Sequence, residues 1–354
     1  MCGIYTTNIP FSPSEIINKL KSINYRGPDN MDILKERNVT LGHLRLSILD
    51  LDSRSNQPMV CEDLHITYNG EIYNFLEVKN ELSLLGHQFK TTSDTEVLLI
   101  GYKVWGADIL QKINGMFAFC IYDSTKQRLF CARDRMGVKP FYYFWDDGQF
   151  EICSQLRPLI PNKEINKDAI SMYLDCGYIP SPFSILKDVH KLSPGHYMEI
   201  DIPSKSNTII KYWDLKTVKT KKITYSQAKK ELHDLLTDAV KIRLQSDVPI
   251  GSFLSGGVDS ALVSSIAGKI SAKPINTFSI GFDNPKFDES KVADEFAKYI
   301  KSHHKTTFCS AHDSLKLLPK LVEVYDEPFA DSSALPSLLL NSVTKPHVTV
   351  ALSG

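Results

Sequence analysis

Long apolar runs are missing from the sequence: its 354 residues contain no stretch of about 18 consecutive apolar residues, so no ordinary transmembrane helix is expected. The first residues lack a basic stretch followed by an apolar one, which argues against a secretory signal peptide. Neither sign of charge dominates, because Lys+Arg and Asp+Glu both number 41, and this balance argues against nucleic acid or an anionic membrane as a partner. The 7 cysteines form no CxxC pair and indicate no zinc site, so we expect reduced thiols and a cytoplasmic protein.

The composition is ordinary for a globular protein, with 42% hydrophobic and 23% charged residues. The length predicts two domains or slightly more, at roughly 150 residues each. Up to about residue 200, short apolar runs alternate with polar or glycine breaks, which is typical of β-strands. Segments 12–23, 75–86 and 94–106 instead predict helices. We therefore expect packed antiparallel sheets with helices outside them.

A polar, lysine-rich stretch over 206–225 predicts a linker between a domain at 1–205 and a domain at 226–354. Beyond it, apolar strands alternate with helical segments, which indicates an α/β domain with a doubly wound parallel sheet. The last residues, TVALSG, are typical of a strand and the start of a strand-to-helix turn. Such a sheet does not usually stop at this edge, so we expect a fragment of a longer protein, incomplete at the C-terminus.

The segment LSGGVDS, residues 254–260, follows a predicted strand and opens a predicted helix. Its two glycines allow a tight turn and a close approach to a ligand, and the first N–H groups of the helix favour an anion. No lysine follows the glycines, so this is not a Walker A loop. We interpret the segment as a pyrophosphate cradle; a plain strand–helix turn with a serine N-cap is the alternative.

A cysteine at position 2 has chemistry of its own, because removal of Met1 would leave a free amine beside the thiol. An α-amine has a pKa of about 8 and a thiol one of about 8.5, so the amine can act as base for its own thiol near neutral pH. The thiolate could then attack a carboxamide, giving a thioester and ammonia. Taken alone, however, Cys2 is more simply an incidental cysteine.

Together, MCGI at the start and SGGVDS at 255–260 resemble the glutamine-hydrolysing asparagine synthetase family, over essentially the whole chain. SGGVDS resembles the PP-loop of N-type ATP pyrophosphatases. The resemblance implies an N-terminal-nucleophile glutaminase, an αββα sandwich of antiparallel sheets, followed by a PP-loop synthetase domain of the adenine nucleotide α-hydrolase-like fold. It implies that Cys2 releases ammonia from glutamine, that ATP converts aspartate to β-aspartyl-AMP and pyrophosphate, and that ammonia displaces AMP to give asparagine.

The resemblance also implies site residues in the first half. Cys2 matches the nucleophile, and Asn69 and Gly70 of YNGEIYN match the oxyanion hole. The glutamine-binding positions would be Arg45, Leu46, Ser47, Ile48, Leu49, Asn69, Gly70, Glu71 and Asp94. Arg45 suits the α-carboxylate of glutamine and Asp94 matches the acceptor for its α-ammonium. The signatures YRGPDN and RDRMGVKPFYY also match, and we interpret them as scaffold or interdomain positions.

In the second half, the resemblance implies ATP binding by Leu254, Ser255, Gly256, Gly257, Asp259, Ser260, Ile280, Ser353 and Gly354. Asp259 is the candidate Mg2+ ligand, although a lone aspartate in such a loop is more often a helix cap. Asp331 and Ser332 of YDEPFADSSALP are expected in the acceptor pocket; an acidic, proline-bounded loop is the alternative. The substrates would be glutamine, aspartate and ATP, and a homodimer is compatible with the pattern.

The sequence departs from the family pattern in two places. The RGPD segment is followed by Asn30, Met31 and Asp32, where the family usually has a glycine. Gln155 and Arg157 stand where the family usually has glutamate and lysine. The second departure lies near the expected domain interface, so it bears on coupling between the domains and not on the glutaminase chemistry.

Several alternatives stay open. An amidotransferase that adenylates another carboxylate, in a secondary-metabolite or surface-polysaccharide pathway, would share the same front end. A non-catalytic homologue could bind only nucleotide or a partner, although the intact glutaminase residues argue against decay. The chain as given could hydrolyse glutamine without synthesis, which we expect of a parallel sheet cut at its ligand edge. Sugar-phosphate and phosphoribosyl amidotransferases share the Cys-Gly-Ile start, but SGGVDS argues against them.

Overall fold

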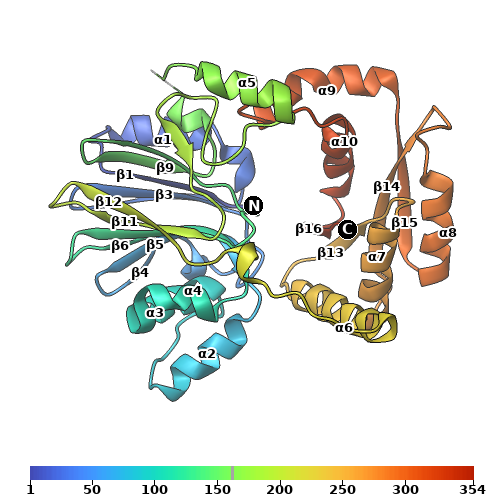
Figure 1. Cartoon of the computed structure of the whole chain (residues 1–354), viewed down its shortest axis with the longest axis horizontal. Coiled ribbons are helices and arrows are strands. Elements are labelled where there is room, and N and C mark those ends of the chain that lie inside the picture. Colours follow the sequence, from blue (N-terminus) through green and yellow to red (C-terminus); the bar gives the residue numbers. More distant parts are fainter. Residues whose placement is uncertain (161–162) are drawn as a thin grey trace. The chain divides into compact units, whose positions relative to one another are not determined.

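The computed structural model describes residues 1–160 and 163–354, and the chain divides into two compact units. Unit 1 comprises Met1–Lys219 and Asp326–Ala330, and unit 2 comprises Thr220–Tyr325 and Asp331–Gly354. Each unit has sheets of its own (Figure 1). Within the described residues, no helix has both the length and the apolar character needed to cross a membrane.

Unit 1 contains two six-stranded sheets in which neighbouring strands run antiparallel, as predicted. The first sheet has the order β10-β8-β9-β1-β3-β2, with β1 at Gly3–Thr7, β2 at Asn30–Glu36, β3 at Val39–Arg45, β8 at Tyr142–Asp146, β9 at Gln149–Cys153 and β10 at Val189–Lys191. The second has the order β12-β11-β7-β6-β5-β4, with β4 at Met59–Cys61, β5 at Leu64–Ile72, β6 at Gly115–Asp123, β7 at Arg128–Arg133, β11 at His196–Asp201 and β12 at Ser206–Lys211.

Alternation of side chains along the strands lets both sheets of unit 1 bury both faces. The sheets pack on each other through side chains such as Ile4 of β1 and Cys120 of β6. Opposite Ile4, Tyr5 packs with Leu20 of α1 (Pro13–Lys21) on the outer face of the first sheet. The outer face of the second sheet packs on α2 (Phe75–Leu84), α3 (Asp94–Trp105) and α4 (Ile109–Lys112). Unit 1 is therefore a four-layer body in the order helix, sheet, sheet, helix (Figure 1). It also contains α5 (Lys167–Cys176).

Unit 2 contains one parallel sheet of order β15-β14-β13-β16, which confirms the predicted parallel sheet. Its strands are β13 (Ile250–Phe253), β14 (Asn276–Phe282), β15 (His303–Cys309) and β16 (Val350–Leu352). Its helices are α6 (Tyr225–Arg243), α7 (Val258–Ile270), α8 (Ser290–Ile300), α9 (Ala311–Val324) and α10 (Ala334–Thr344). The chain runs from β13 outward to β15 and then returns to the other side of β13, so the strand order reverses between β13 and β16.

The start of the expected linker at 206 differs from the structure. Residues Ser206–Lys211 form β12, an edge strand paired antiparallel with β11. Side chains of an edge strand are largely exposed, as Ile209 is at 42%, so they show little apolar alternation. The polar, lysine-rich sequence was therefore interpreted as a linker. The first unit extends to Lys219 and also includes Asp326–Ala330, which the sequence placed in the second domain.

Candidate active site

Cys2 immediately precedes β1, and its thiol lies against the segment that follows β3. These two points meet because β1 pairs antiparallel with β3, with Gly3 opposite Leu44. The Leu46 N–H donates to Cys2 Sγ at 3.4 Å, and the same sulfur lies 3.7 Å from the Leu46 carbonyl oxygen. The structure therefore brings Leu46, one of the expected glutamine-binding residues, directly to the thiol.

The RGPD segment, interpreted from sequence as scaffold or interdomain, contacts the main chain of the candidate nucleophile, Cys2. Arg26 is 9% exposed, and its Nε donates to the Cys2 carbonyl oxygen at 2.9 Å. A Cβ on Gly27 would lie 2.3 Å from backbone atoms of β3, so only glycine allows this close approach. Asp29 Oδ2 accepts the N–H of Ser47, another expected glutamine-binding residue, at 2.7 Å. The segment thus positions both the main chain of Cys2 and the loop beside it.

Asn69 and Gly70 lie on β5, which is joined to β3 by a contact of 3.1 Å between His43 Nε2 and the Tyr68 carbonyl oxygen. Asn69 is 1% exposed, and its Nδ2 has no hydrogen-bond partner among the described residues. Leaving a buried donor unpaired costs about 1–3 kcal/mol, so this amide is available to a ligand. A Cβ on Gly70 would lie 2.5 Å from the Met116 carbonyl oxygen, which excludes larger residues.

Asp94, the first residue of α3, braces β5 on both sides of these two residues. Its Oδ2 accepts the Tyr68 hydroxyl at 2.7 Å and the Ile72 N–H at 2.9 Å. Burial raises the pKa of Asp94, and these hydrogen bonds oppose the rise. Burial also raises the pKa of Glu71 well above its ordinary value; the charge of Asp94 adds to this rise and Lys139 opposes it. Two crowded carboxyl groups of this kind favour a bound cation such as an α-ammonium.

Arg45 ends β3 and is 5% exposed. Its Nη1 donates to the Asp52 carbonyl oxygen at 2.9 Å and to Asn56 Oδ1 at 2.7 Å. Its Nη2 donates to the carbonyl oxygens of Leu49, at 3.3 Å, and of Asp50. The guanidinium therefore shapes the loop after β3, and an α-carboxylate would have to replace one of these loop acceptors.

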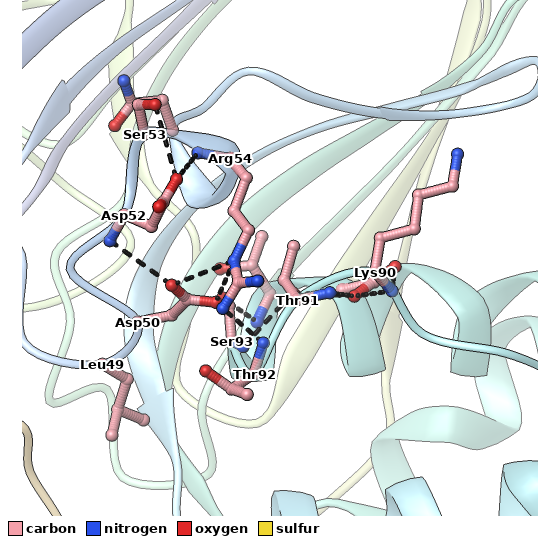
Figure 2. A network of polar contacts seen from close by, with 12 residues as sticks. Leu49, Asp50, Asp52, Ser53, Arg54, Lys90, Thr91, Thr92 and Ser93 are labelled. Carbon is pink, nitrogen blue, oxygen red and sulfur yellow. Dashed lines mark hydrogen bonds and ion pairs between the residues drawn. The ribbon is translucent and has the colours of Figure 1, made fainter.

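Asp50 joins the loop after β3 to the segment that leads into α3, as Figure 2 shows. Its Oδ2 accepts the Thr92 N–H at 2.8 Å and Arg54 Nε at 3.1 Å, and its Oδ1 accepts the Asp52 N–H at 3.3 Å. Burial acts to raise the pKa of Asp50, but the hydrogen bonds from Thr92 and Arg54 prevail and lower it to about 2. One residue thus joins the loop that bonds to Arg45, through its main-chain oxygen, to the segment that precedes Asp94, through its carboxylate.

Lys139 brings a second cation into electrostatic range of Cys2. The residue is 4% exposed, and its N–H donates to Asp134 Oδ2 at 2.9 Å. The same oxygen accepts the Phe117 N–H at 3.2 Å, and Phe117 lies opposite Gly70 across the β5–β6 ladder. Burial lowers the pKa of Lys139, and the charges of Glu71 and Cys2 oppose the shift. The signature RDRMGVKP therefore supplies a buried cation whose charge acts on Cys2, as well as scaffold.

Burial controls protonation at the start of the chain. It lowers the pKa of the Met1 amine to about 5, and it raises the pKa of the Cys2 thiol. While Met1 is in place, burial therefore favours the uncharged form of both groups.

In unit 2, residues 254–257 connect β13 to α7, and side-chain oxygens hold the loop's N–H groups. Ser260 Oγ accepts the Ser255 N–H at 3.1 Å, and Ser255 Oγ accepts the Gly257 N–H at 3.1 Å. Glu289 Oε2 accepts the Gly256 N–H at 3.1 Å. A carboxylate therefore occupies one position on this loop where an anionic ligand could bind.

The strand order reverses at β13 and β16, and ligands of such sheets bind beyond the carboxyl ends of the strands at this point. Ser353 and Gly354 follow β16, and a Cβ on Gly354 would lie 2.4 Å from the backbone nitrogen of Ser260. Ile280 lies near the end of β14, which pairs with β13. The structure thus brings the expected ATP-binding residues to the carboxyl ends of the strands.

Three residues expected in the metal site or the acceptor pocket show no arrangement specific to a ligand. Asp259 is exposed near the start of α7, and within the described residues no group of three or more His, Cys, Asp or Glu side chains could hold a metal ion. Asp331 Oδ1 accepts the Ser333 N–H at 2.9 Å before α10, which is a structural contact. Ser332 is exposed. None of the hydrogen bonds among the described residues joins Asp331 or Ser332 to the loop after β13.

Comparison with known proteins matches residues 1–213 to the glutamine amidotransferase domain family and residues 231–354 to the asparagine synthase family. A Methanocaldococcus jannaschii protein that bears the name asparagine synthetase 2 (glutamine-hydrolysing) is 40% identical over 388 residues, covering 100% of this chain and 74% of that protein. The chain belongs to the glutamine-hydrolysing asparagine synthetase family. Asparagine synthetase 1 (glutamine-hydrolysing) of Bacillus subtilis is 36% identical, covering 96% of this chain and 54% of that protein.

This family member therefore spans about half the length of the B. subtilis relative and 74% of the M. jannaschii one. Among solved structures, the glutamine phosphoribosylpyrophosphate amidotransferase of B. subtilis, complexed with ADP and GMP, is a more distant likeness. It has a TM-score of 0.47 and 15% identity, covering 86% of this chain and 65% of that one.

Sequence reasoning did not assign Arg26, Lys139 or Asp50 to the glutaminase site of this synthetase family member. Arg26 and Lys139 stand in segments that match the family, so a signal was present. A signature does not say which way a side chain points, however, and both residues were interpreted as scaffold. Asp50 lies in ordinary loop sequence, and only its contacts with Thr92 and Arg54 reveal its role.

Proposed function

We propose that the protein is a glutamine-dependent asparagine synthetase, with an N-terminal-nucleophile glutaminase in unit 1 and a PP-loop ATP pyrophosphatase fold in unit 2. The observation that supports the glutaminase most directly is Asn69 Nδ2, which is buried and has no partner among the described residues. Such a donor is costly to keep unpaired and is suited to an oxygen on which charge develops during reaction.

Hydrolysis would begin when the amine of Cys2, freed by Met1 removal, accepts the thiol proton. The thiolate attacks the carboxamide carbon of glutamine, and Asn69 Nδ2 and the Gly70 N–H donate to the resulting oxyanion. Collapse breaks the C–N bond while the protonated amine returns its proton to the departing nitrogen, which gives ammonia and a thioester. Water then cleaves the thioester to glutamate and the free thiol.

Substrate binding would use the remaining groups around Cys2. Asp94 and Glu71 would take the α-ammonium of glutamine, because two crowded carboxyl groups are stabilised by a cation. Arg45 would take the α-carboxylate in exchange for a loop carbonyl. Residues 46–49 would line the same wall, since Leu46 contacts the thiol and Leu49 contacts Arg45.

The second half-reaction would use the loop after β13. Its N–H groups would hold the phosphates of ATP, displacing the Glu289 carboxylate from Gly256. Aspartate would attack the α-phosphate to give β-aspartyl-AMP and pyrophosphate, and ammonia would displace AMP to form asparagine, with Asp331 and Ser332 near the acceptor. Asp259 would hold Mg2+, which usually takes one or two carboxylates together with phosphate oxygens and offsets their charge.

The compartment we propose is the cytoplasm. All seven cysteines are free thiols in the structure, and Cys176 is exposed. Free thiols of this kind persist in a reducing environment.

Ammonia release from glutamine by the purified protein tests the glutaminase, with removal of Met1 checked by intact mass. We expect Cys2→Ala to abolish release and Cys176→Ala, at an exposed cysteine, to leave it unchanged. Release that survives Cys2→Ala would contradict the nucleophile. Pyrophosphate release that depends on ATP and aspartate, compared with other carboxylates, tests the acceptor.

A further inference from the structure

The segment Asp326–Ala330 lies within the span matched to asparagine synthase, residues 231–354, yet it packs inside unit 1. The Ala330 N–H donates to the Gly177 carbonyl oxygen at 2.8 Å. Glu327 forms an ion pair with Lys191. Backbone and side-chain contacts thus hold the segment at several points.

Asp326 is the most enclosed group of this segment, with a side chain that is 4% exposed. Its Oδ2 accepts Gln155 Nε2 at 3.2 Å and the Arg157 N–H at 3.1 Å. Its Oδ1 pairs with Arg157 Nε at 3.2 Å. The carboxylate therefore fixes the amide of Gln155 in one orientation, with nitrogen toward Asp326.

The oxygen of the same amide faces the catalytic centre. Gln155 Oε1 accepts Arg26 Nη1 at 3.5 Å, and Arg26 Nε donates to the Cys2 carbonyl oxygen at 2.9 Å. Arg26 Nη2 is buried and has no partner in the described part of the chain. Within those residues, the Arg26 guanidinium is oriented by one bond to the nucleophile and one bond to Gln155. Burial lowers the pKa of Arg26, and the charge of Asp326 is among those that oppose the shift.

We propose that Asp326 is a positioning residue for glutamine hydrolysis: it fixes the Gln155 amide, which orients the Arg26 guanidinium that holds the main chain of Cys2. This proposal rests on the glutaminase function proposed above. It also accounts for the glutamine at position 155. A glutamine amide can accept from Arg26 and donate to Asp326 at once, whereas a glutamate carboxylate could only accept.

A charge-swap series tests the proposal. We expect Asp326→Asn to lower kcat for glutamine hydrolysis about tenfold with little change in KM, a typical coupling for contacting residues. Gln155→Glu should cause a similar loss, because it sets two carboxylates at the 3.2 Å contact. The double variant should recover most of kcat, because an acceptor again faces Arg26 and a donor again faces position 155. Failure of the double variant to recover, or an unchanged kcat in Asp326→Asn, would overturn the proposal.

Glu327→Gln is the matched control, because it neutralises a neighbouring carboxylate that pairs with Lys191 and accepts the Ile185 N–H. We expect it to change kcat less than about twofold, while melting temperatures report any loss of stability in each variant. A loss of kcat in Glu327→Gln equal to that in Asp326→Asn would show that docking of the segment alone matters, and would overturn the proposal.

Alkylation of Cys2 by iodoacetamide, followed by peptide mass, gives a readout that needs no glutamine turnover. We expect the rate of Cys2 alkylation to change several-fold in Asp326→Asn and to return to the wild-type rate in the double variant. If the wild-type protein released no ammonia but the alkylation pattern held, the proposed function would fail, while the positioning of the Cys2 main chain by Asp326 would stand. An identical alkylation rate in all variants would overturn the positioning role.

Discussion

The two units offer their candidate ligand groups in different ways. In unit 1 the groups are mainly side chains and they are buried, with Asn69 at 1% and Asp94 at 5% exposed. In unit 2 the loop after β13 offers mainly backbone N–H groups, and Asp259 and Ser353 are exposed. A side-chain site must be oriented by the surrounding packing, whereas a backbone site needs only the local strand–turn–helix.

The units also differ in how these groups are occupied. Asn69 Nδ2 and Arg26 Nη2 of unit 1 are buried without a partner among the described residues. The loop of unit 2 satisfies its N–H groups with the oxygens of Ser255, Ser260 and Glu289. The Asn69 donor of unit 1 is thus free in advance, whereas Arg45 and the loop of unit 2 must each exchange internal contacts for a ligand. All three tryptophans lie in unit 1, so their fluorescence reports on that unit alone.

The largest expected effect is that of Gly70→Ala on unit 1. Its Cβ would lie 2.4 Å from Tyr68 Cε2 and 2.5 Å from the Met116 carbonyl oxygen. We expect loss of glutamine hydrolysis and destabilisation by about 3 kcal/mol, measured by ammonia release and by urea unfolding followed by tryptophan fluorescence. Gly86→Ala is the control: it meets no atom within 4 Å but has a φ of +94°, so we expect a loss of about 1 kcal/mol without loss of activity. Near-normal hydrolysis by Gly70→Ala would contradict the arrangement of this site.

The next effect separates catalysis from stability within unit 1. Asn69→Ala should lower kcat about 10²- to 10³-fold, as expected for one lost oxyanion donor. The urea midpoint should change little, because Nδ2 has no partner to lose among the described residues. Asn74→Ala should do the reverse, since the Asn74 amide donates to the Lys112 carbonyl oxygen at 2.9 Å and accepts the Asn114 N–H at 2.7 Å. Equal effects of both variants on kcat would remove the distinction.

A smaller effect tests the independence of unit 2. A Cβ on Gly256 would lie 2.9 Å from Glu289 Cβ, so Gly256→Ala should weaken ATP binding about tenfold by disturbing the loop. Glutamine hydrolysis should be unchanged. Gly268→Ala in α7, whose Cβ would meet its nearest atoms at 3.9 Å, should leave ATP binding intact and stabilise the helix by about 0.5–1 kcal/mol. Calorimetric titration with ATP is the measurement, and unaltered binding by Gly256→Ala would contradict the role of the loop.

The smallest effect, within the first pH unit below 6.5, is a pH dependence of unit 1. Burial lowers the pKa of His43 from 6.5 to about 3. Below pH 6.5 the unfolded chain takes up a proton that the folded chain does not, so the free energy of unfolding falls as pH falls toward 3, by up to about 1.4 kcal/mol per pH unit. Above pH 6.5 this contribution is fully present. His43→Gln should reduce the slope in urea unfolding followed by tryptophan fluorescence, and His233→Gln, at an exposed histidine of α6, should not. A wild-type slope in His43→Gln would contradict the assignment.

The sequence predicted well what is local in the chain. The antiparallel and parallel sheets followed from short apolar runs and from the alternation of strands with helices. The loop at 254–260 was recognisable because a strand, two glycines and a helix are adjacent in sequence and their backbone groups need no distant partner. Edge strand β12 was missed because its side chains are largely exposed and carry no strong pattern.

The sequence by itself determined the two fold classes and the loop of unit 2, because each depends on residues close together in the chain, and it indicated Cys2 through motifs in a family order. Only the tertiary structure decided that Arg26 holds Cys2, that Asp50 joins two loops, and that Asp326 belongs to unit 1. These contacts join distant residues, 129 positions apart for Arg26 and Gln155 and 171 for Gln155 and Asp326. Their formation depends on sheet register and on packing between layers, which no local pattern contains.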